Sequence, residues 1–468
     1  MSHELKQSMV DGGLWAAGGR LVAIAGAFVL NLVLARSLTP EDYGVYFVVM
    51  STMIILATVG TVGMDRVVVR FVAASKAMGN WGEVRAVVGR CLVTVLAATA
   101  VLCLVFYLLA PWFFTQVVKM PAAIAFSGLI VLWLFFSTLQ RQLAETFRGL
   151  NDIRGATLFG GLRNNGILNS LITCGIVLAL WASGAMTLAA AFATTVSASL
   201  LVVIAATWTL WRRLRGTGSH PPPAAFVREW STTKVLFEGW PLWLASMIAV
   251  LRAQVSGWFA AGFDSAEHVA LFAIADRFAL LMAAPLTIVN LLLPPVVAEL
   301  HARGEIKRMG RVVQAVGGLA SLPCVVILLL IVLAGRPALG VLFGDHYEAA
   351  YPMLVILCIG QVANMATGAW QVVLPMTGLR RQTLRVSMWA AAVQFSCSII
   401  GGYTAGVLGV AIGATAGAVA GNVLGLIAAH RYLGIWTFIS MRREVLMEAV
   451  ALLTKRIVGL MPARVRDV

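Results

Sequence analysis

The sequence is poor in charged residues, and poorer in acids than in bases. Of its 468 residues only 12% are charged, against about a quarter in ordinary soluble domains, while 60% are apolar. Aspartate and glutamate number 20, against 35 lysines and arginines, which leaves a formal net charge of +15. These proportions exclude an ordinary water-soluble enzyme and indicate a chain that lies largely within a membrane.

The chain also lacks the motifs of several chemistries. Its six cysteines all fall in or at the edge of apolar stretches and form no Cys-x-x-Cys pair, so we expect neither a disulfide framework nor a zinc site. No phosphate-binding glycine loop, His-Glu-x-x-His helix or nucleophile elbow occurs. We therefore expect a transporter without cofactor or metal, and no cleaved signal peptide before the first apolar span.

Long apolar runs dominate what is present. A transmembrane helix needs about 20 residues, and on this scale the hydropathy predicts a helical membrane protein with many spans. Twelve are expected, at residues 14–36, 43–64, 86–110, 122–144, 156–181, 185–211, 235–261, 267–298, 312–335, 350–375, 383–402 and 405–430. The even number places both termini on the same side of the membrane.

Basic side chains gather in one set of loops. The opposite set contains only Arg36, Lys119 and Arg336, and acids outnumber these bases. The acids are Glu41, Asp42, Asp264, Glu267, Asp345 and Glu348. Because basic residues in short loops stay in the cytoplasm, both termini are predicted to be cytoplasmic. Membrane topology thus accounts for the positive charge, and no nucleic-acid partner is expected.

The two halves of the chain repeat. Residues 35–46 align with residues 261–272, residues 82–85 align with 304–307, and a shared Gly-Leu pair follows in each half. Three matches in the same order predict two parallel six-helix repeats around a central cavity. The expected parts are an N-terminal lobe at 1–211, a cytoplasmic linker at 212–234, a C-terminal lobe at 235–432 and a cytoplasmic amphipathic tail at 433–468.

Three stretches carry a family resemblance. Residues 34–46 read LARSLTPEDYGVY, residues 342–350 read LFGDHYEAA, and residues 406–411 read GVLGVA. In these stretches the chain resembles bacterial polysaccharide and O-antigen flippases of the multidrug/oligosaccharidyl-lipid/polysaccharide exporter superfamily. The motifs mark topology and packing more than chemistry.

The resemblance implies a function and a location. It implies alternating access between two six-helix lobes in the bacterial inner membrane, and transfer of an undecaprenyl-diphosphate-linked oligosaccharide from the cytoplasmic to the periplasmic leaflet. The cargo would be a repeat unit of O-antigen, capsule or exopolysaccharide. Membrane lipid, a polysaccharide polymerase and export proteins are the partners that it implies.

Several polar residues fall inside the predicted spans and form the candidate substrate site. A guanidinium in hydrocarbon needs a partner or a wet cavity, and its fork of donors suits phosphate oxygens. We expect a cationic cavity that binds the diphosphate and the sugars through Arg20, Arg163, Asn164, Asn169, Arg252 and Arg277. The alternative for Arg277 is an ion pair with the neighbouring Asp276, and Glu238 is the other intramembrane acid that could pair or couple an ion.

Prolines and glycines predict local geometry within the spans. Pro241 and Pro285 interrupt apolar stretches, and we expect them to serve as bending points in gating. Glycines at every fourth position from Gly409 to Gly425 predict a bare helix face that packs closely against a neighbour.

Charged residues near the ends of two spans have plainer interpretations. Arg141, Glu145 and Arg148 are spaced for pairing along one helix, and we expect them to form its solvated end. Asp65 follows the second span, where capping or pairing within the loop is favoured over ion coupling.

Two other functions stay open at this stage. A cation-coupled multidrug exporter of the multidrug and toxin extrusion type shares the duplicated plan, but its cargo favours acids over arginines in the cavity. A membrane polysaccharide polymerase or ligase is the weaker alternative, because such enzymes present a long outer loop, and the outer loops predicted here have about fifteen residues or fewer.

Overall fold

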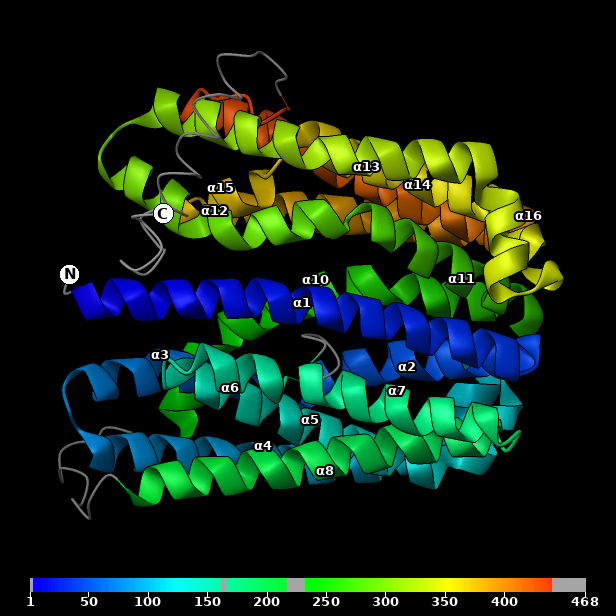
Figure 1. Ribbon diagram of the computed structural model, residues 1–468, viewed down its shortest axis with the longest axis horizontal. Helices are drawn as coiled ribbons and strands as arrows, with labels where there is room; N and C mark the ends of the chain where they lie inside the picture. The colour runs from blue at the N-terminus through cyan, green and yellow to red at the C-terminus, as the bar shows by residue number, and fades with distance from the viewer. Residues whose placement is uncertain (1–2, 161–165, 217–231, 440–468) are drawn as a thin grey trace, which may run out of the picture. The chain divides into compact units, whose positions relative to one another are not determined.

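The computed structural model describes residues 3–160, 166–216 and 232–439, and within these ranges the chain forms helices and no strands. One compact unit spans Leu14–Ala270 and contains most of α1 (His3–Ser37) and the helices up to α10 (Figure 1). These helices are α2 Pro40–Gly60, α3 Met64–Ala77, α4 Trp81–Trp112, η1 Phe113–Val117, η2 Pro121–Phe126, α5 Ser127–Gly149, α6 Ile153–Leu158, α7 Ile167–Ala182, α8 Leu188–Arg215 and α10 Thr232–Phe263.

The other compact unit comprises Met1–Gly13 and Leu271–Val468. It contains most of α11, which starts at Ala266, and all the helices that follow. These helices are α11 Ala266–Met282, α12 Ala284–Ala302, α13 Ile306–Phe343, η3 Asp345–Ala350, α14 Tyr351–Thr367, α15 Trp370–Met376 and α16 Arg380–Leu433.

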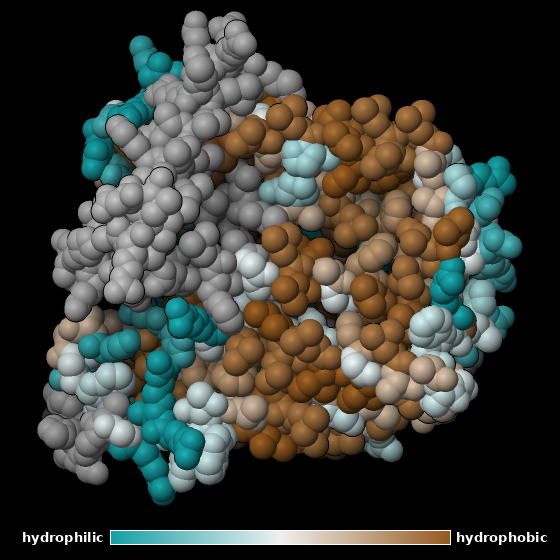
Figure 2. Space-filling view, in the orientation of Figure 1, coloured by the Kyte–Doolittle hydropathy of each residue, from teal (hydrophilic) through white to brown (hydrophobic). Residues whose placement is uncertain are grey.

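The chain is a multi-pass membrane protein by the length and composition of its helices. Among the described residues, seven helices are long and apolar enough to cross a membrane, and two shorter apolar helices lie at Leu21–Ser37 and Ile167–Ala182. Figure 2 shows apolar side chains over much of the visible face and hydrophilic ones gathered toward the helix ends. The all-helical fold is confirmed, whereas the count of twelve spans and the cytoplasmic termini stay predictions.

Local sequence signals set the start of α2. Thr39 is the N-cap, and its Oγ1 accepts a hydrogen bond from the backbone N–H of Asp42 at 3.2 Å. Pro40 occupies the first turn, where a missing N–H costs nothing, and Glu41 and Asp42 stabilise the positive end of the helix dipole. The family-like stretch at residues 34–46 therefore encodes a helix boundary.

The core of the first unit lies among α3, α4, α5 and α8. Val68, Val88, Phe147 and Val202 are buried there in one apolar cluster. In the second unit a separate cluster joins α12, α13 and α15 through Val297, Val313 and Val373, among others.

Helix α10 runs along α2. Val250 is buried with Ile54 and Ile55, and the indole N–H of Trp258 donates to Thr52 Oγ1 at 2.9 Å. At the start of α2, a side chain at Gly44 would collide with the backbone oxygen of Ala266, so glycine permits the close approach. Packing thus places α10 with the predicted N-terminal lobe, although the sequence repeat makes it the first helix of the second.

The helix order repeats along the chain. Helices α2, α3 and α4 are followed by the 3-10 helix η2 and then α5, while α11, α12 and α13 are followed by the 3-10 helix η3 and then α14. The α-helix that precedes the 3-10 helix is long in both series: it is α4 in the first and α13 in the second. This order agrees with the predicted duplication.

The fifth predicted span is not one continuous helix. Residues 156–181 were expected to form a single span, but α6 ends at Leu158 and α7 begins at Ile167. A side chain at Gly166 would collide with the backbone of Gly160, so the two ends of the break lie against each other. The glycines allow this backbone contact, at which the helix is interrupted. The prediction of one continuous helix over residues 156–181 was therefore wrong.

Two other spans break where the sequence indicates. The span predicted at 267–298 is divided at Ala283 into α11 and α12, and Pro285 lies in the first turn of α12, where proline is tolerated. Helix α10 is continuous on both sides of position 241, and the role of both prolines in gating stays a prediction. Helix α16 contains a sharp bend at Ala405 and Gly406, which separates the two spans predicted there.

The glycine face on α16 packs as predicted. Side chains at Gly409, Gly413 and Gly417 would collide with Gly401, Ser398 and Gln394 respectively, on the arm before the bend. Because these glycines lack side chains, the two arms of α16 pack backbone to backbone.

Candidate functional site

A partly open cavity, called here the polar cavity, lies within the unit Leu14–Ala270. Its volume is about 60 Å³, which is room for about four water-sized groups. Five helices contribute to it: α1, α2, α5, α7 and α8. The lining residues are Gly26, Ala27, Leu30, Asn31, Tyr46, Met50, Trp133, Asn169, Ser170, Thr173, Cys174, Thr195 and Ser199.

The polar cavity lies well inside the helices. Asn31 is six residues before the end of α1, Tyr46 is six after the start of α2, and Asn169 is thirteen before the end of α7. At about 1.5 Å per residue, the lining lies roughly 9–20 Å from those helix ends. A depth of this size lies within a hydrocarbon core of about 30 Å.

Asn31 is fixed by its own hydrogen bonds. Its amide nitrogen donates to the carbonyl of Ala27 at 2.6 Å, and its Oδ1 accepts from the hydroxyl of Tyr43 at 2.9 Å. Thr195 likewise donates its hydroxyl to the carbonyl of Phe192 at 2.8 Å. These side chains form a rigid polar wall, because each already has a partner within the unit.

Two lining groups are different, because Asn169 Oδ1 and Thr173 Oγ1 are buried without a hydrogen-bond partner among the described residues. They are four residues apart and therefore lie one turn apart on the same face of α7. A buried polar atom without a partner costs about 1–3 kcal/mol. Both atoms line the polar cavity, so an occupant of that cavity can supply the partners.

An aromatic and apolar wall completes the polar cavity. Tyr46 and Trp133 are almost fully buried, and their ring centroids are 6.3 Å apart with an interplanar angle of 18°. Met50 lies beside them in the lining. Among the described lining residues none carries a charge. Amides, hydroxyls and aromatic faces suit an uncharged polar ligand, in particular a sugar.

Of the predicted site residues, Asn169 lines the polar cavity. Arg163 and Asn164 lie outside the described residues, as do the side chains of Arg20, Glu238 and Pro241. The predicted cationic ring therefore stays a prediction. Sequence reasoning missed the rest of the lining, since serine, threonine and tyrosine are unremarkable inside an apolar span.

Two of the predicted arginines are described in their own helices. Arg252 is half-buried on α10, eleven residues before Phe263. Arg277 is also half-buried, eleven residues after Ala266 at the start of α11, with Asp276 beside it. At about 1.5 Å per residue both lie about 17 Å along the helix from that end, a depth at which a guanidinium needs a partner or a polar environment.

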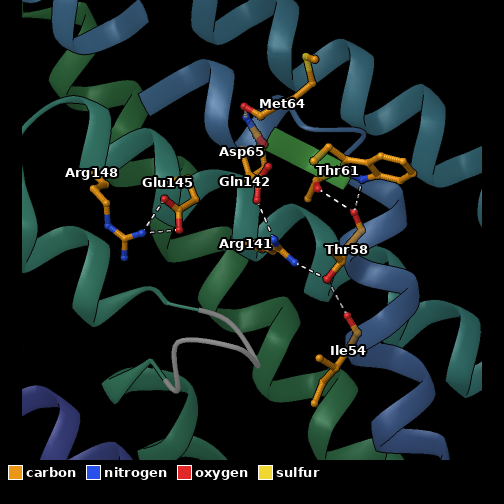
Figure 3. A network of polar contacts seen from close by, with 10 residues as sticks. Ile54, Thr58, Thr61, Met64, Asp65, Arg141, Gln142, Glu145 and Arg148 are labelled. Carbon is orange, nitrogen blue, oxygen red and sulfur yellow. Dashed lines mark hydrogen bonds and ion pairs between the residues drawn. The ribbon is translucent and has the colours of Figure 1, made fainter. Parts of the chain in front are cut away.

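A second polar cluster joins α2, α3 and α5 in the same unit, and Figure 3 shows Arg141 between Asp65 and Thr58. The guanidinium donates to Asp65 Oδ2 at 2.7 Å and to Thr58 Oγ1 at 2.7 Å. Only 10% of the Arg141 side chain and 4% of the Asp65 side chain are exposed. The expected capping or pairing of Asp65 within its loop was wrong, because Asp65 lies on α3 and its partner is 76 residues away on α5.

The same cluster corrects the expected solvated end of α5. Arg141 and Glu145 are buried, and of the three predicted residues only Arg148 is substantially exposed. Arg148 donates to both carboxylate oxygens of Glu145 at 2.5 and 2.6 Å. The helix end is buried because α3 packs against it, which the spacing of charges along α5 cannot reveal.

Helix α10 is also tied to this cluster. The indole N–H of Trp243 donates to the backbone carbonyl of Thr58 at 2.9 Å, and the hydroxyl of Thr61 donates to the same oxygen at 3.0 Å. Thr58 therefore links Arg141 on α5 to Trp243 on α10. The cluster joins α2, α5 and α10, and two of these helices, α2 and α5, also line the polar cavity.

Basic residues meet at the turn between α5 and α6, outside the apolar spans. Asp152 accepts from the backbone N–H of Gly155 at 3.0 Å and pairs with Arg213 of α8. The Nζ of Lys76 donates to the carbonyl of Leu150 at 2.5 Å. Burial, together with the charge of Arg213, lowers the pKa of Lys76 from its usual 10.5, although Asp152 opposes the shift.

Solved structures with this fold are transporters. The chain matches an inward-facing multidrug resistance MATE family transporter of the MOP superfamily with a TM-score of 0.69 at 14% identity, over 89% of this chain and 98% of that one. It matches the lipid II flippase MurJ in an inward closed conformation with a TM-score of 0.67 at 10% identity, over 96% of this chain and 92% of that one. At these identities the likeness shows the fold alone.

A third structure with the same fold is a MOP superfamily transporter from Pyrococcus furiosus, whose binding pocket is described as having reverse polarity. It matches with a TM-score of 0.63 at 15% identity, over 93% of this chain and 98% of that one. The fold is therefore that of the MOP-superfamily transporters.

The sequence match assigns the chain to a narrower group than the fold does. The model of the polysaccharide biosynthesis protein family matches residues 9–301, which is well over half of the chain. The chain belongs to this family of polysaccharide biosynthesis proteins. No curated protein matches the sequence.

Proposed function

We propose that the protein is a flippase that moves an undecaprenyl-diphosphate-linked oligosaccharide from the cytoplasmic to the periplasmic leaflet of the bacterial inner membrane. The proposal rests on the polar cavity, found in a chain that belongs to the family of polysaccharide biosynthesis proteins. Its described lining offers amides, hydroxyls and aromatic faces and no charge. Such a surface suits a glycan, whose hydroxyls and ring faces need hydrogen bonds and apolar contacts.

The diphosphate needs a different environment from the sugars. A guanidinium stays protonated and offers two parallel N–H donors, which match phosphate oxygens held away from water. We assign this role to Arg252 and Arg277, together with Arg20 and Arg163, and we assign the amide of Asn164 to the sugars. The half-burial of Arg252 and Arg277 at mid-membrane depth supports the assignment.

A conformational change is required to carry the cargo across. Alternating access needs elements that bend, and the break between α11 and α12 at Ala283 supplies one such point. We assign Pro285 the role of maintaining that break, because a proline in the first turn fixes where α12 begins.

The alternative is a cation-coupled multidrug exporter, because a multidrug resistance transporter shares this fold. A cationic drug needs a carboxylate in its binding site. Of the two intramembrane acids, Asp276 and Glu238, the structure describes the side chain of Asp276, which does not line the polar cavity. The lining therefore supports the glycan carrier over the drug exporter.

The test reconstitutes the purified protein in liposomes and follows the initial rate at which a lipid-linked oligosaccharide reaches the opposite leaflet. A membrane-impermeant lectin reports the exposed sugar, and efflux of a cationic dye is measured in parallel. We expect sugar translocation and no dye efflux. Dye efflux without sugar translocation would establish the drug exporter instead.

The arginine assignment has a matched pair of variants. Arg252→Gln removes the charge but keeps amide donors, and losing a charged hydrogen bond to phosphate lowers the translocation rate about tenfold or more. Arg380→Gln makes the same change at an exposed position at the start of α16. Arg380→Gln is expected to match the wild type, and an Arg252→Gln variant that also does so contradicts the assignment.

A further inference from the structure

The described lining of the polar cavity carries no charge. A charge buried in this lining would have no counter-charge among the described residues, and an unpaired buried charge is strongly disfavoured. The diphosphate of a lipid-linked sugar therefore does not belong here. The occupant is an uncharged polar group.

Two polar atoms in the lining can form hydrogen bonds with an occupant. Asn169 Oδ1 is an acceptor, and the Thr173 hydroxyl is both donor and acceptor; neither has a partner among the described residues. Asn31 and Thr195 already bond within the unit, so the unmet capacity lies on one face of α7. A complementary occupant presents an N–H to Asn169 and a carbonyl to Thr173, side by side.

The small size of the polar cavity and its apolar wall restrict the occupant further. The cavity has a volume of about 60 Å³ and is partly open, so a substituent of a sugar can enter it while the ring lies at its opening. Tyr46, Met50 and Trp133 form an apolar wall in it. A group of four heavy atoms that carries an N–H, a C=O and a methyl matches this small volume and this wall.

We propose that the polar cavity receives the acetamido group of an N-acetylated sugar in the transported glycan. The proposal rests on the proposed flippase function and narrows its substrate class to glycans with an N-acetyl sugar. The amide N–H of the sugar donates to Asn169 Oδ1, the Thr173 hydroxyl donates to the acetyl oxygen, and the methyl group lies against the aromatic wall. A hydroxymethyl group or water satisfies the hydrogen bonds but leaves the apolar wall without a contact.

The experiment compares two lipid substrates in the same liposomes, undecaprenyl-diphosphate-linked N-acetylglucosamine and undecaprenyl-diphosphate-linked glucose. These differ by the acetamido group in place of one hydroxyl. We expect the N-acetyl substrate to move at least tenfold faster, because two neutral hydrogen bonds and the methyl contact together supply more free energy than a tenfold change in rate requires. Translocation of neither sugar would refute the flippase itself, while equal rates would refute only the acetamido site.

Variants locate the preference. Thr173→Val removes the hydroxyl at nearly constant shape, and Asn169→Leu removes the amide. Each variant loses one of the two hydrogen bonds to the acetamido group and is expected to reduce the ratio of the two rates about fivefold. Thr209→Val is the matched control, because Thr209 is exposed on α8 and does not line the cavity. A ratio that persists in both cavity variants would overturn the site.

A series of wild-type substrates makes the test independent of variant folding. N-acetyl, N-propionyl and N-butanoyl glucosamine linked to the same lipid differ only in acyl length. The small cavity predicts rates that fall as methylenes are added, by about tenfold at N-butanoyl. Rates that stay level or rise with acyl length would contradict the assignment.

Discussion

The buried ion pair between Asp65 and Arg141 makes a quantitative prediction about stability. The two side chains are 4% and 10% exposed and lie 2.7 Å apart, and when the carboxylate is removed the guanidinium keeps its hydrogen bond to the hydroxyl of Thr58. Breaking a buried pair from one side costs about 3–5 kcal/mol, because it leaves a charge without its counter-charge. Asp65→Ala should therefore lower the free energy of unfolding by about that amount.

An exposed pair supplies the control. Arg308 and Glu305 on either side of the start of α13 are 2.8 Å apart, but their side chains are 42% and 33% exposed. Surface pairs contribute roughly 0–1 kcal/mol, so Glu305→Ala should change the free energy of unfolding by no more than that. The N–O distances in the two ion pairs are nearly equal, so a difference in the free energy of unfolding lost on removing the acid reflects the difference in burial.

The assay is denaturant titration in mixed micelles, followed by near-ultraviolet circular dichroism. The double variant Asp65→Ala/Arg141→Met should unfold less readily than Asp65→Ala alone, since it removes both charges instead of leaving one buried. Equal losses of under about 1 kcal/mol in Asp65→Ala and Glu305→Ala would refute the argument that burial makes this pair costly to break.

Three further predictions concern pH, packing and the membrane potential. The pKa of Lys76 is lower in the folded chain than its usual 10.5. At pH values between the folded pKa and 10.5 the unfolded chain binds more protons than the folded chain, so the free energy of unfolding should rise with pH there. Lys76→Met should reduce that rise when unfolding is measured over this pH range. Gly409→Ala places a Cβ against the backbone of Gly401 and should cost about 1–3 kcal/mol in thermal unfolding, whereas Gly89→Ala meets nothing within 4 Å and should not destabilise the protein. An inside-negative membrane potential should accelerate outward transfer of a diphosphate, since moving two negative charges releases about 4–5 kcal/mol per 100 mV. Initial translocation rates that do not change when valinomycin imposes such a potential would exclude this coupling.

The elements predicted correctly from the sequence are those with local signals. Apolar runs predicted the helices, Pro285 predicted the break before α12, and the glycines at 409, 413 and 417 predicted the close packing between the two arms of α16. Each signal lies within one or two turns of the feature that it specifies. Local patterns of this kind report the conformation of their own segment, because helix breaks and close contacts depend on the residues that make them.

Features formed by distant segments could not be predicted. The Asp65–Arg141 pair joins residues far apart in the chain, and the polar cavity combines five helices. The break between α6 and α7 did have a local signal, the glycines at 160, 161 and 166 around a polar run, but the apolar average over residues 156–181 concealed it. Asn169 was recognised as polar in a span, whereas Thr173 was not, since threonine is ordinary in transmembrane helices.

The most direct measurement of the proposed function is the leaflet in which lipid-linked glycan resides in cells that lack this protein. The account predicts that undecaprenyl-diphosphate-linked oligosaccharide accumulates with its sugars facing the cytoplasm, and that restoring the wild-type chain returns it to the periplasmic face. Glycan that reaches the periplasmic face at the normal rate without the protein, and without a second flippase in the cell, would contradict it.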